Sequence, residues 1–305
     1  MPRQQQQQQQ QSPQSQQLGS VHMPGTECVA PWLSHDTVCA LLSDPPTTLV
    51  FVGDSVTRHF MHGMQLVVRG DYRAGAMRND AGVPPNETHV CTCNRQFARK
   101  ECRPYILKDT RHVEPNQACP NARVVYFGAT KKDEINVTEV SDFVNSQERA
   151  LLLIGGWGLH DSLRAKPVYY DLVARLHERV KHSRSVKTLC VGVHATQDNM
   201  PAEFLPFQNN GKVKDYNGVL QRLCLQRHVR FFDTFELTHS APAIDGVHYG
   251  IEGVRKHSAP AIDGEHNGIE INVLKAHLLL SYVMHSAAQP WDEATWRRPP
   301  LPEGQ

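Results

Sequence analysis

The chain has 305 residues, a net charge of +1 and 40% hydrophobic residues. This length is sufficient for one large α/β domain. Its charges are interspersed, without the basic tail or stripe typical of nucleic-acid-binding proteins, so we expect no nucleic-acid partner. The longest apolar run, at 150–159, is broken by glycines and is too short for a bilayer, so we expect no membrane span in this chain.

Both ends of the chain have a composition that does not predict folding. Residues 1–24 are rich in Gln and are expected to be a disordered tail. Residues 289–305 form a Pro-rich tail with nothing to pack. The folded domain is therefore predicted to span 25–288.

Cysteine content and two sequons indicate a secretory-lumen or extracellular protein. The chain has eight cysteines, of which four fall between Cys91 and Cys119. The sequons make Asn86 and Asn136 candidate glycosylation sites. Met1, however, is followed by glutamines and not by the apolar core of a signal peptide. Either the true N-terminus lies upstream, or the protein is not secreted and is cytoplasmic.

Five short apolar runs alternate with helical patterns along the domain. We predict strands at 49–52, 123–128, 150–154, 188–194 and 229–233, and helices at 56–68, 139–149, 169–181, 215–227 and 272–285. Apolar runs that do not alternate with polar residues are typical of parallel strands covered on both faces. The sequence therefore predicts a three-layer α/β/α fold around a five-stranded, mostly parallel sheet.

A Cys-rich segment at 70–122 interrupts this alternation. It shows no periodicity and is interpreted as a surface excursion that its own cysteines cross-link if they are oxidised. Cys91, Cys93 and Cys102 could instead bind zinc, but they lack a paired C-x-x-C knuckle. We therefore favour disulfides or free thiols over a metal.

The turn after the first strand is the first candidate for chemistry. Gly53-Asp54-Ser55 separates the strand from a helix, so Ser55 would lie at the carboxyl edge of the sheet, beside a helix N-terminus. Such a position favours a developing negative charge and suits a nucleophilic serine. An Asp-Ser helix cap is the structural alternative.

The second candidate is a duplicated loop at 239–270. Each copy contains D-G-x-H, first as Asp245/His248 and then as Asp263/His266. A carboxylate three residues before a histidine can orient the imidazole, which can then accept a proton from a serine. A metal site built from the four evenly spaced histidines is the alternative, but duplication of a two-histidine unit accounts for their spacing.

These blocks together resemble the GDSL/SGNH hydrolase superfamily, and most closely its branch of PC-esterase and trichome-birefringence-like carbohydrate O-acetyl enzymes. The resemblance rests on Gly53-Asp-Ser-Val-Thr-Arg58, a glycine-rich loop after the third strand, and D-G-x-H after the fifth. It implies a flavodoxin-like sheet and acyl-ester chemistry without a cofactor or metal.

The resemblance also assigns roles to individual residues. It implies that Ser55 is the nucleophile, His248 its general base and Asp245 the group that orients this base, with His266 and Asp263 as the alternative copy. The oxyanion hole would use backbone N–H groups of Ser55, Gly128 and Gly156. The third block departs from the family because 154–161 contains no Asn; His160 or a further backbone amide is the candidate substitute.

Four further residues are candidates for binding the substrate. Arg58 could bind a carboxylate, Trp157 could stack on a sugar, and His160 and His194 follow the third and fourth strands. A solvated Arg, a core Trp and a structural His194 are the alternatives. His160 with Asp161 is a further candidate acid/base pair.

The sequence thus favours a serine esterase that hydrolyses or transfers an acyl group, and the expected substrate is an O-acetyl group of a carbohydrate. Hydrolase and transferase share these residues, and no partner domain supplying acyl groups is visible in the chain, which favours hydrolysis. The alternative is a catalytically impaired carbohydrate-binding or interaction protein with the same fold. A metal-dependent hydrolase using the histidine-rich loop is the third and weakest possibility.

Overall fold

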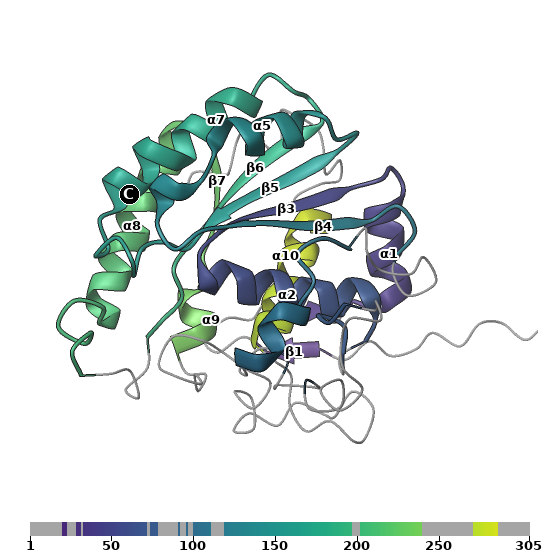
Figure 1. The fold of residues 1–305 in the computed structure, drawn as a ribbon, viewed down its shortest axis with the longest axis horizontal. Coiled ribbons are helices and arrows are strands. Elements are labelled where there is room, and N and C mark those ends of the chain that lie inside the picture. The colour runs from purple at the N-terminus through teal and green to yellow at the C-terminus, as the bar shows by residue number, and fades with distance from the viewer. Residues whose placement is uncertain are drawn as a thin grey trace, which may run out of the picture.

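A five-stranded parallel sheet forms the centre of the computed structural model (Figure 1). Its strands are β3 (Thr48–Gly53), β4 (Arg123–Gly128), β5 (Ala150–Gly155), β6 (Val186–Val191) and β7 (Arg230–Phe232). The structure describes residues 20–22, 29–31, 33–71, 74–78, 91, 96, 100–110, 119–196, 202–239 and 271–285. A separate antiparallel pair joins β1 (Ser20–His22) to β2 (Val29–Pro31).

Helices cover both faces of the sheet. One face carries α1 (His35–Ser43), α2 (Ser55–Arg69) and α10 (Ile271–His285), and the other carries α5 (Val137–Asn145), α7 (Ala174–Val180) and α8 (Asn210–Gln226) (Figure 1). The shorter helical elements are η1 (Lys100–Tyr105), η4 (Lys132–Glu134), α6 (Ala165–Val168), the π-helical η5 (Tyr169–Val173) and α9 (Phe235–His239). The predicted three-layer α/β/α fold is confirmed.

The apolar strands supply two separate cores. In β3, Leu49 and Phe51 pack on the α2 and α10 side, whereas Val50 and Val52 pack on the α5 and α7 side. Successive side chains of a strand point to opposite faces, so a strand buried on both faces must be apolar at every position. The continuous apolar runs in the sequence follow from this arrangement.

The strand order determines where a site can form. The order across the sheet is β4-β3-β5-β6-β7, so the first strand along the chain is flanked by the second and the third. This is the 2-1-3-4-5 order of flavodoxin-like sheets. The connections leave β3 and β5 in opposite directions, so the carboxyl ends of these two strands form the topological switch point, where open α/β sheets bind their ligands. Ser55 follows β3 at this position.

Two disulfides cross-link the described part of the chain. Cys91 pairs with Cys102 inside the 70–122 excursion, which favours the disulfide over the zinc alternative for these two residues. Cys39 pairs with Cys119 and joins α1 to the segment before β4. The excursion is therefore cross-linked both internally and, against expectation, to α1. None of the described helices is long and apolar enough to cross a membrane.

Loss of the Cys39–Cys119 disulfide is expected to lower the free energy of unfolding by about 2–4 kcal/mol. The bond closes a loop with a sequence separation of 80 residues, and its removal frees the unfolded chain. Cys39→Ala/Cys119→Ala can be compared with Cys91→Ala/Cys102→Ala, whose sequence separation is only 11 residues. Urea unfolding should show a loss about 1–2 kcal/mol larger for the first pair. An equal or smaller loss would contradict the loop-closure argument.

Candidate active site

Ser55 is the first residue of α2 and is separated from the inner strand β3 by a single residue, Asp54. Its side chain is half-buried. The first N–H groups of a helix have no partner within the helix and carry a partial positive charge. The nucleophile predicted from the sequence therefore lies at the switch point of the sheet, at the N-terminus of α2, whose partial positive charge favours a developing negative charge.

Asp54 fixes this turn in place. Its Oδ1 accepts a hydrogen bond from Val56 N–H at 3.0 Å and caps α2. Its Oδ2 accepts from Trp157 N–H at 2.8 Å, in the loop after β5. Asp54 is only 2% exposed, so its buried carboxyl group links the N-terminus of α2 to the loop after β5 through these two hydrogen bonds. The structural alternative, a helix cap, is thus correct for Asp54 and compatible with a catalytic Ser55.

Glycine is required around Asp54 because the backbone approaches it closely. Gly156 has φ of +78°, and a Cβ there would lie 2.2 Å from Asp54 Oδ1. At Gly53, a Cβ would lie 2.1 Å from Thr57 Oγ1. Side chains cannot occupy space already filled by buried groups. The glycines of the first block and of the β5 loop therefore allow α2 and this loop to contact each other.

Tyr126, on β4, holds the same turn from its other side. Its hydroxyl lies 3.0 Å from Gly53 O and 2.9 Å from Asp54 O, so that one O–H is shared between two carbonyl acceptors. Burial raises the pKa of Tyr126 well above its usual value and keeps the hydroxyl protonated as a donor. A Cβ at Gly128 would lie 2.2 Å from the Tyr126 ring, so this glycine allows the ring to fold over the strand end.

Burial raises the pKa of Asp54 above its ordinary value. The hydrogen bond from Trp157, the nearby His160 and the α2 amides oppose this rise. His160 Nε2 lies 3.9 Å from Asp54 Oδ2, and its side chain is 43% exposed. The partly exposed imidazole thus lies between solvent and the residue that precedes Ser55.

Asp54→Asn is expected to be less stable than the wild type by about 1–3 kcal/mol at pH 4, because the amide nitrogen cannot accept from Trp157 N–H. A carboxyl whose folded-state pKa is raised contributes most to stability below its unfolded pKa and loses this contribution as pH rises through the folded pKa. The difference in the free energy of unfolding between the wild type and Asp54→Asn should therefore decrease from pH 4 to pH 7. Urea unfolding across this range measures this difference, and an increase with pH would refute the raised pKa of Asp54.

Arg58 lies on the same face of α2 as Ser55, because residues three apart on a helix are neighbours. Its side chain is half-buried, and burial lowers its pKa. Tyr126 and Asp54 oppose this decrease, whereas the nearby Arg103 adds to it. Within the part of the chain that the structure describes, the Arg58 guanidinium forms no hydrogen bond or ion pair. This cation beside Ser55 is suited to binding an anionic group.

Two predicted substrate contacts are corrected by burial. Trp157 is 0% exposed, and its indole N–H donates to Ala129 O at 3.1 Å, so the ring belongs to the core and cannot stack on a sugar. His194 is 2% exposed, with Nδ1 2.9 Å from Lys275 Nζ. Trp157 therefore has a packing role in the core, and His194 has a structural role through its contact with α10.

The predicted oxyanion donor Gly128 also requires correction. Ala129 N–H donates to Gly53 O on β3, whereas Tyr126 N–H donates to Lys108 O on the other side of β4. Backbone N–H groups alternate along a strand, so the Gly128 N–H is on the Tyr126 side and is directed away from β3. Of the predicted donors, Ser55 and Gly156 lie at the carboxyl ends of the neighbouring strands β3 and β5.

Several predicted site residues lie outside the described residues: Asp245, His248, Asp263, His266 and Asn86. Asn136 is described, and its exposed side chain accepts from Glu139 N–H at 3.2 Å as the N-cap of α5. Asp161 is adjacent to His160, and burial raises the pKa of its carboxyl. The structure thus brings Ser55, Gly156, Arg58 and His160 to one edge of the sheet.

Sequence reasoning missed the second role of Asp54, the anchoring role of Tyr126 and the buried Lys275 beside His194. A single signal could have indicated Lys275: it is the one Lys, Arg, Asp or Glu in the mostly apolar last helix, Ile271–His285. Tyr126 gave no signal, because an aromatic residue in an apolar strand is expected to be part of the core.

No family model and no curated protein match this chain. Among solved structures, it is similar to a carbohydrate acetylesterase from Sinorhizobium meliloti, with 16% identity over 78% of this chain and 98% of the other, and a TM-score of 0.39. It is also similar to the aryl esterase of M. smegmatis, with 15% identity over 77% of this chain and 98% of the other, and a TM-score of 0.38. A third similar structure is a GDSL-like lipase from Bacteroides thetaiotaomicron, with 12% identity over 72% of this chain and 89% of the other, and a TM-score of 0.37. At these TM-scores the function has to be argued from the site itself.

Proposed function

We propose that this protein is a serine ester hydrolase that removes an acyl group, with O-acetyl groups of a carbohydrate as the substrate class. One observation carries the proposal: Ser55 begins a helix at the switch point of the sheet, and the buried Asp54 fixes this turn to the glycine-rich β5 loop. A fixed serine hydroxyl beside helix N–H groups is the arrangement that acyl transfer requires.

The reaction would proceed in two steps. Ser55 Oγ attacks the acyl carbon and transfers its proton to the imidazole of His248, which Asp245 orients; His266 and Asp263 are the alternative pair. The tetrahedral intermediate then expels the alcohol, which takes the proton from the imidazole and leaves an acyl-serine. Water attacks this ester by the same route and releases the free acid, and Ser55 recovers its proton.

The oxyanion would be held by the Ser55 N–H and the Gly156 N–H, and the partial positive charge at the N-terminus of α2 would stabilise it further. The imidazole of His160 would supply the side-chain donor in place of the absent Asn. His160 belongs to the same loop, is partly exposed and lies beside Asp54. Arg58 would bind a carboxylate or another anionic group of the substrate, because it is on the Ser55 face of α2.

His160→Ala is expected to lower kcat by about 10²–10³-fold with little change in KM, because an oxyanion donor acts mainly in the transition state. His160→Asn should recover part of this loss, since its amide can also donate a hydrogen bond. Steady-state hydrolysis of 4-nitrophenyl acetate measures both variants. An effect confined to KM would assign His160 to substrate binding and refute its role as a donor.

The proposed function is tested by turnover of two substrates, 4-nitrophenyl acetate and acetylated xylan, with released acetate as the readout. Wild type should hydrolyse both, and one of His248→Ala and His266→Ala should abolish turnover while the other retains it. The inactive variant identifies the working copy of the repeat. Folded wild type without turnover of either substrate would overturn the hydrolase proposal in favour of a binding protein. Activity lost on incubation with a chelator would instead favour a metal-dependent hydrolase.

A further inference from the structure

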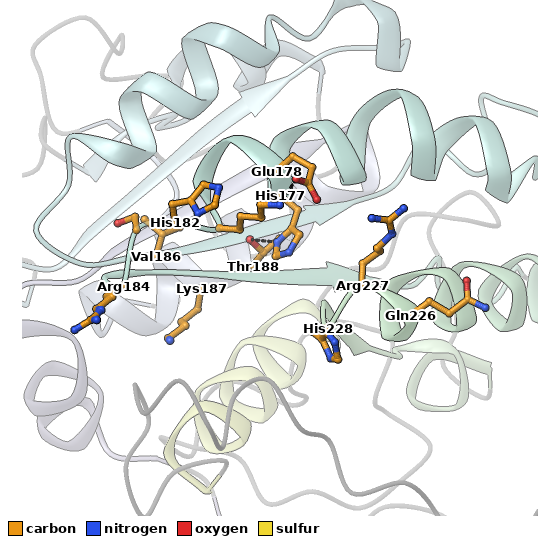
Figure 2. A pocket seen from close by; sticks show the side chains of 12 residues that line it. His177, Glu178, His182, Arg184, Val186, Lys187, Thr188, Gln226, Arg227 and His228 are labelled. Atoms are coloured by element: carbon orange, nitrogen blue, oxygen red, sulfur yellow. Dashed lines mark hydrogen bonds and ion pairs between the residues drawn. The ribbon is translucent and has the colours of Figure 1, made fainter.

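A cleft of about 530 Å³ lies at the amino edge of the sheet. It is lined by the end of α7, the turn before β6, the first residues of β6 and the turn after α8 (Figure 2). Ser55 lies at the carboxyl edge, and a six-residue strand such as β6 spans about 20 Å. The cleft is therefore separate from the candidate active site.

This cleft is basic although the whole chain is nearly neutral. The chain has 32 Lys and Arg against 31 Asp and Glu. The residues that line the cleft include four Lys and Arg, namely Lys181, Arg184, Lys187 and Arg227, and a single acidic residue, Glu178. The sequence showed no basic stripe because the fold brings these residues together from two separate segments.

Contacts within the cleft leave two guanidinium groups available. Glu178 forms an ion pair with Lys181, and His177 Nδ1 lies 3.3 Å from Thr188 Oγ1. Arg184 and Arg227 are exposed, and their side chains form no hydrogen bond or ion pair with any described residue. Figure 2 shows Arg184 at one end of the cleft and Arg227 at the other, with His177 and Thr188 between them.

We propose that this cleft binds a sulfated polysaccharide, with Arg184 and Arg227 each contacting a sulfate group. Guanidinium groups bind oxyanions through paired N–H donors. Two of them at opposite ends of a cleft suit a polymer with repeated anionic groups better than a single small anion. The exposed imidazoles of His182 and His228, which also line the cleft, add further hydrogen-bonding groups for the ligand.

The lining favours a polysaccharide over a nucleic acid. Single-stranded nucleic acids are bound by aromatic side chains that stack on the bases. None of the described residues that line the cleft is Phe, Tyr or Trp. The two disulfides are typical of proteins in oxidising compartments, where sulfated glycans rather than nucleic acids are the common polyanions.

Fluorescence anisotropy with a labelled heparin oligosaccharide at physiological salt tests the proposal. Arg184→Gln/Arg227→Gln should weaken binding by about 10- to 100-fold. Arg184→Lys/Arg227→Lys should weaken it less, because the charge remains and only the paired donors are lost. Lys131→Gln/Lys212→Gln removes the same charge from exposed residues outside the cleft and should bind as the wild type does.

Three results would overturn the proposal. Equal weakening by the cleft pair and the control pair would show attraction by net charge and no site. A single-stranded DNA oligonucleotide that binds as tightly as heparin would assign the cleft to nucleic acid. Hyaluronan, whose charges are carboxylates, would exclude sulfate as the recognised group if it bound as tightly as heparin. None of these results depends on Ser55, so they are independent of the hydrolase proposal.

Discussion

Ser55→Ala is expected to lower the rate of 4-nitrophenyl acetate hydrolysis by about 10⁴-fold or more, because the acyl-serine cannot form without the hydroxyl. Ser55 is half-buried at the start of α2, and alanine removes one oxygen without filling new space. The free energy of unfolding should therefore change by less than about 1 kcal/mol. Steady-state kinetics and urea unfolding on the same preparation separate these two effects.

A serine outside the candidate active site provides the matched control for Ser55→Ala. Ser146 follows α5, is exposed and donates only to Phe143 O at 2.7 Å. Ser146→Ala should hydrolyse the ester at the wild-type rate. If Ser55→Ala kept more than about a tenth of the activity, the observed hydrolysis would come from another group, and a nucleophilic role for Ser55 would be excluded.

Gly156→Ala is expected to lower the free energy of unfolding by about 3–5 kcal/mol and to abolish turnover. The new methyl group would lie 2.2 Å from Asp54 Oδ1, and the backbone there has φ of +78°, which disfavours alanine. Either Asp54 or the β5 loop has to move, and the bond from Trp157 N–H to Asp54 Oδ2 is then lost. Urea unfolding and ester hydrolysis measure the two consequences.

Gly218, inside α8, provides the opposite control. A Cβ there meets only Arg222 Nη1, at 3.7 Å, and the residue is within a regular helix. Gly218→Ala should therefore raise the free energy of unfolding by about 0.5–1 kcal/mol. If Gly156→Ala did not lower the free energy of unfolding, the close contact of Gly156 with Asp54 would not be needed to link α2 to the loop after β5.

The strands were the most predictable part of the fold. β4 occupies the predicted 123–128, and β3 and β5 extend their predictions by one residue at one or both ends. Burial on both faces demands apolar residues at every position, and this demand is visible in the sequence without any tertiary information. The order of the strands was not visible, because it depends on the direction of each crossover connection.

Helix starts were less predictable, for a local reason. The helices expected at 139–149 and 215–227 begin earlier, at Val137 and Asn210. In both cases an asparagine, Asn136 or Asn209, caps the helix through its side-chain oxygen. Asparagine is also common in turns, so apolar periodicity alone placed the start at a later residue.

The candidate site was predictable where chemistry and local structure coincide. Gly53-Asp-Ser55 marked the nucleophile because a strand, a break and a helix meet there. The orientation of side chains was not predictable. Trp157 and His194 follow strands at the carboxyl edge of the sheet, where the candidate site lies, but their side chains are buried. The basic cleft could not be recognised either, because Arg184 and Arg227 belong to separate segments that line the same cleft only in the folded chain.

The most direct test of the central claim is the site at which a fluorophosphonate probe modifies the folded protein. Such probes react with activated serine hydroxyls, and mass spectrometry of the digested adduct identifies the modified residue. The account predicts one adduct, on the peptide that contains Ser55, and none in Ser55→Ala. An adduct on a different serine, or folded wild type that remains unmodified, would contradict an activated Ser55 at the start of α2.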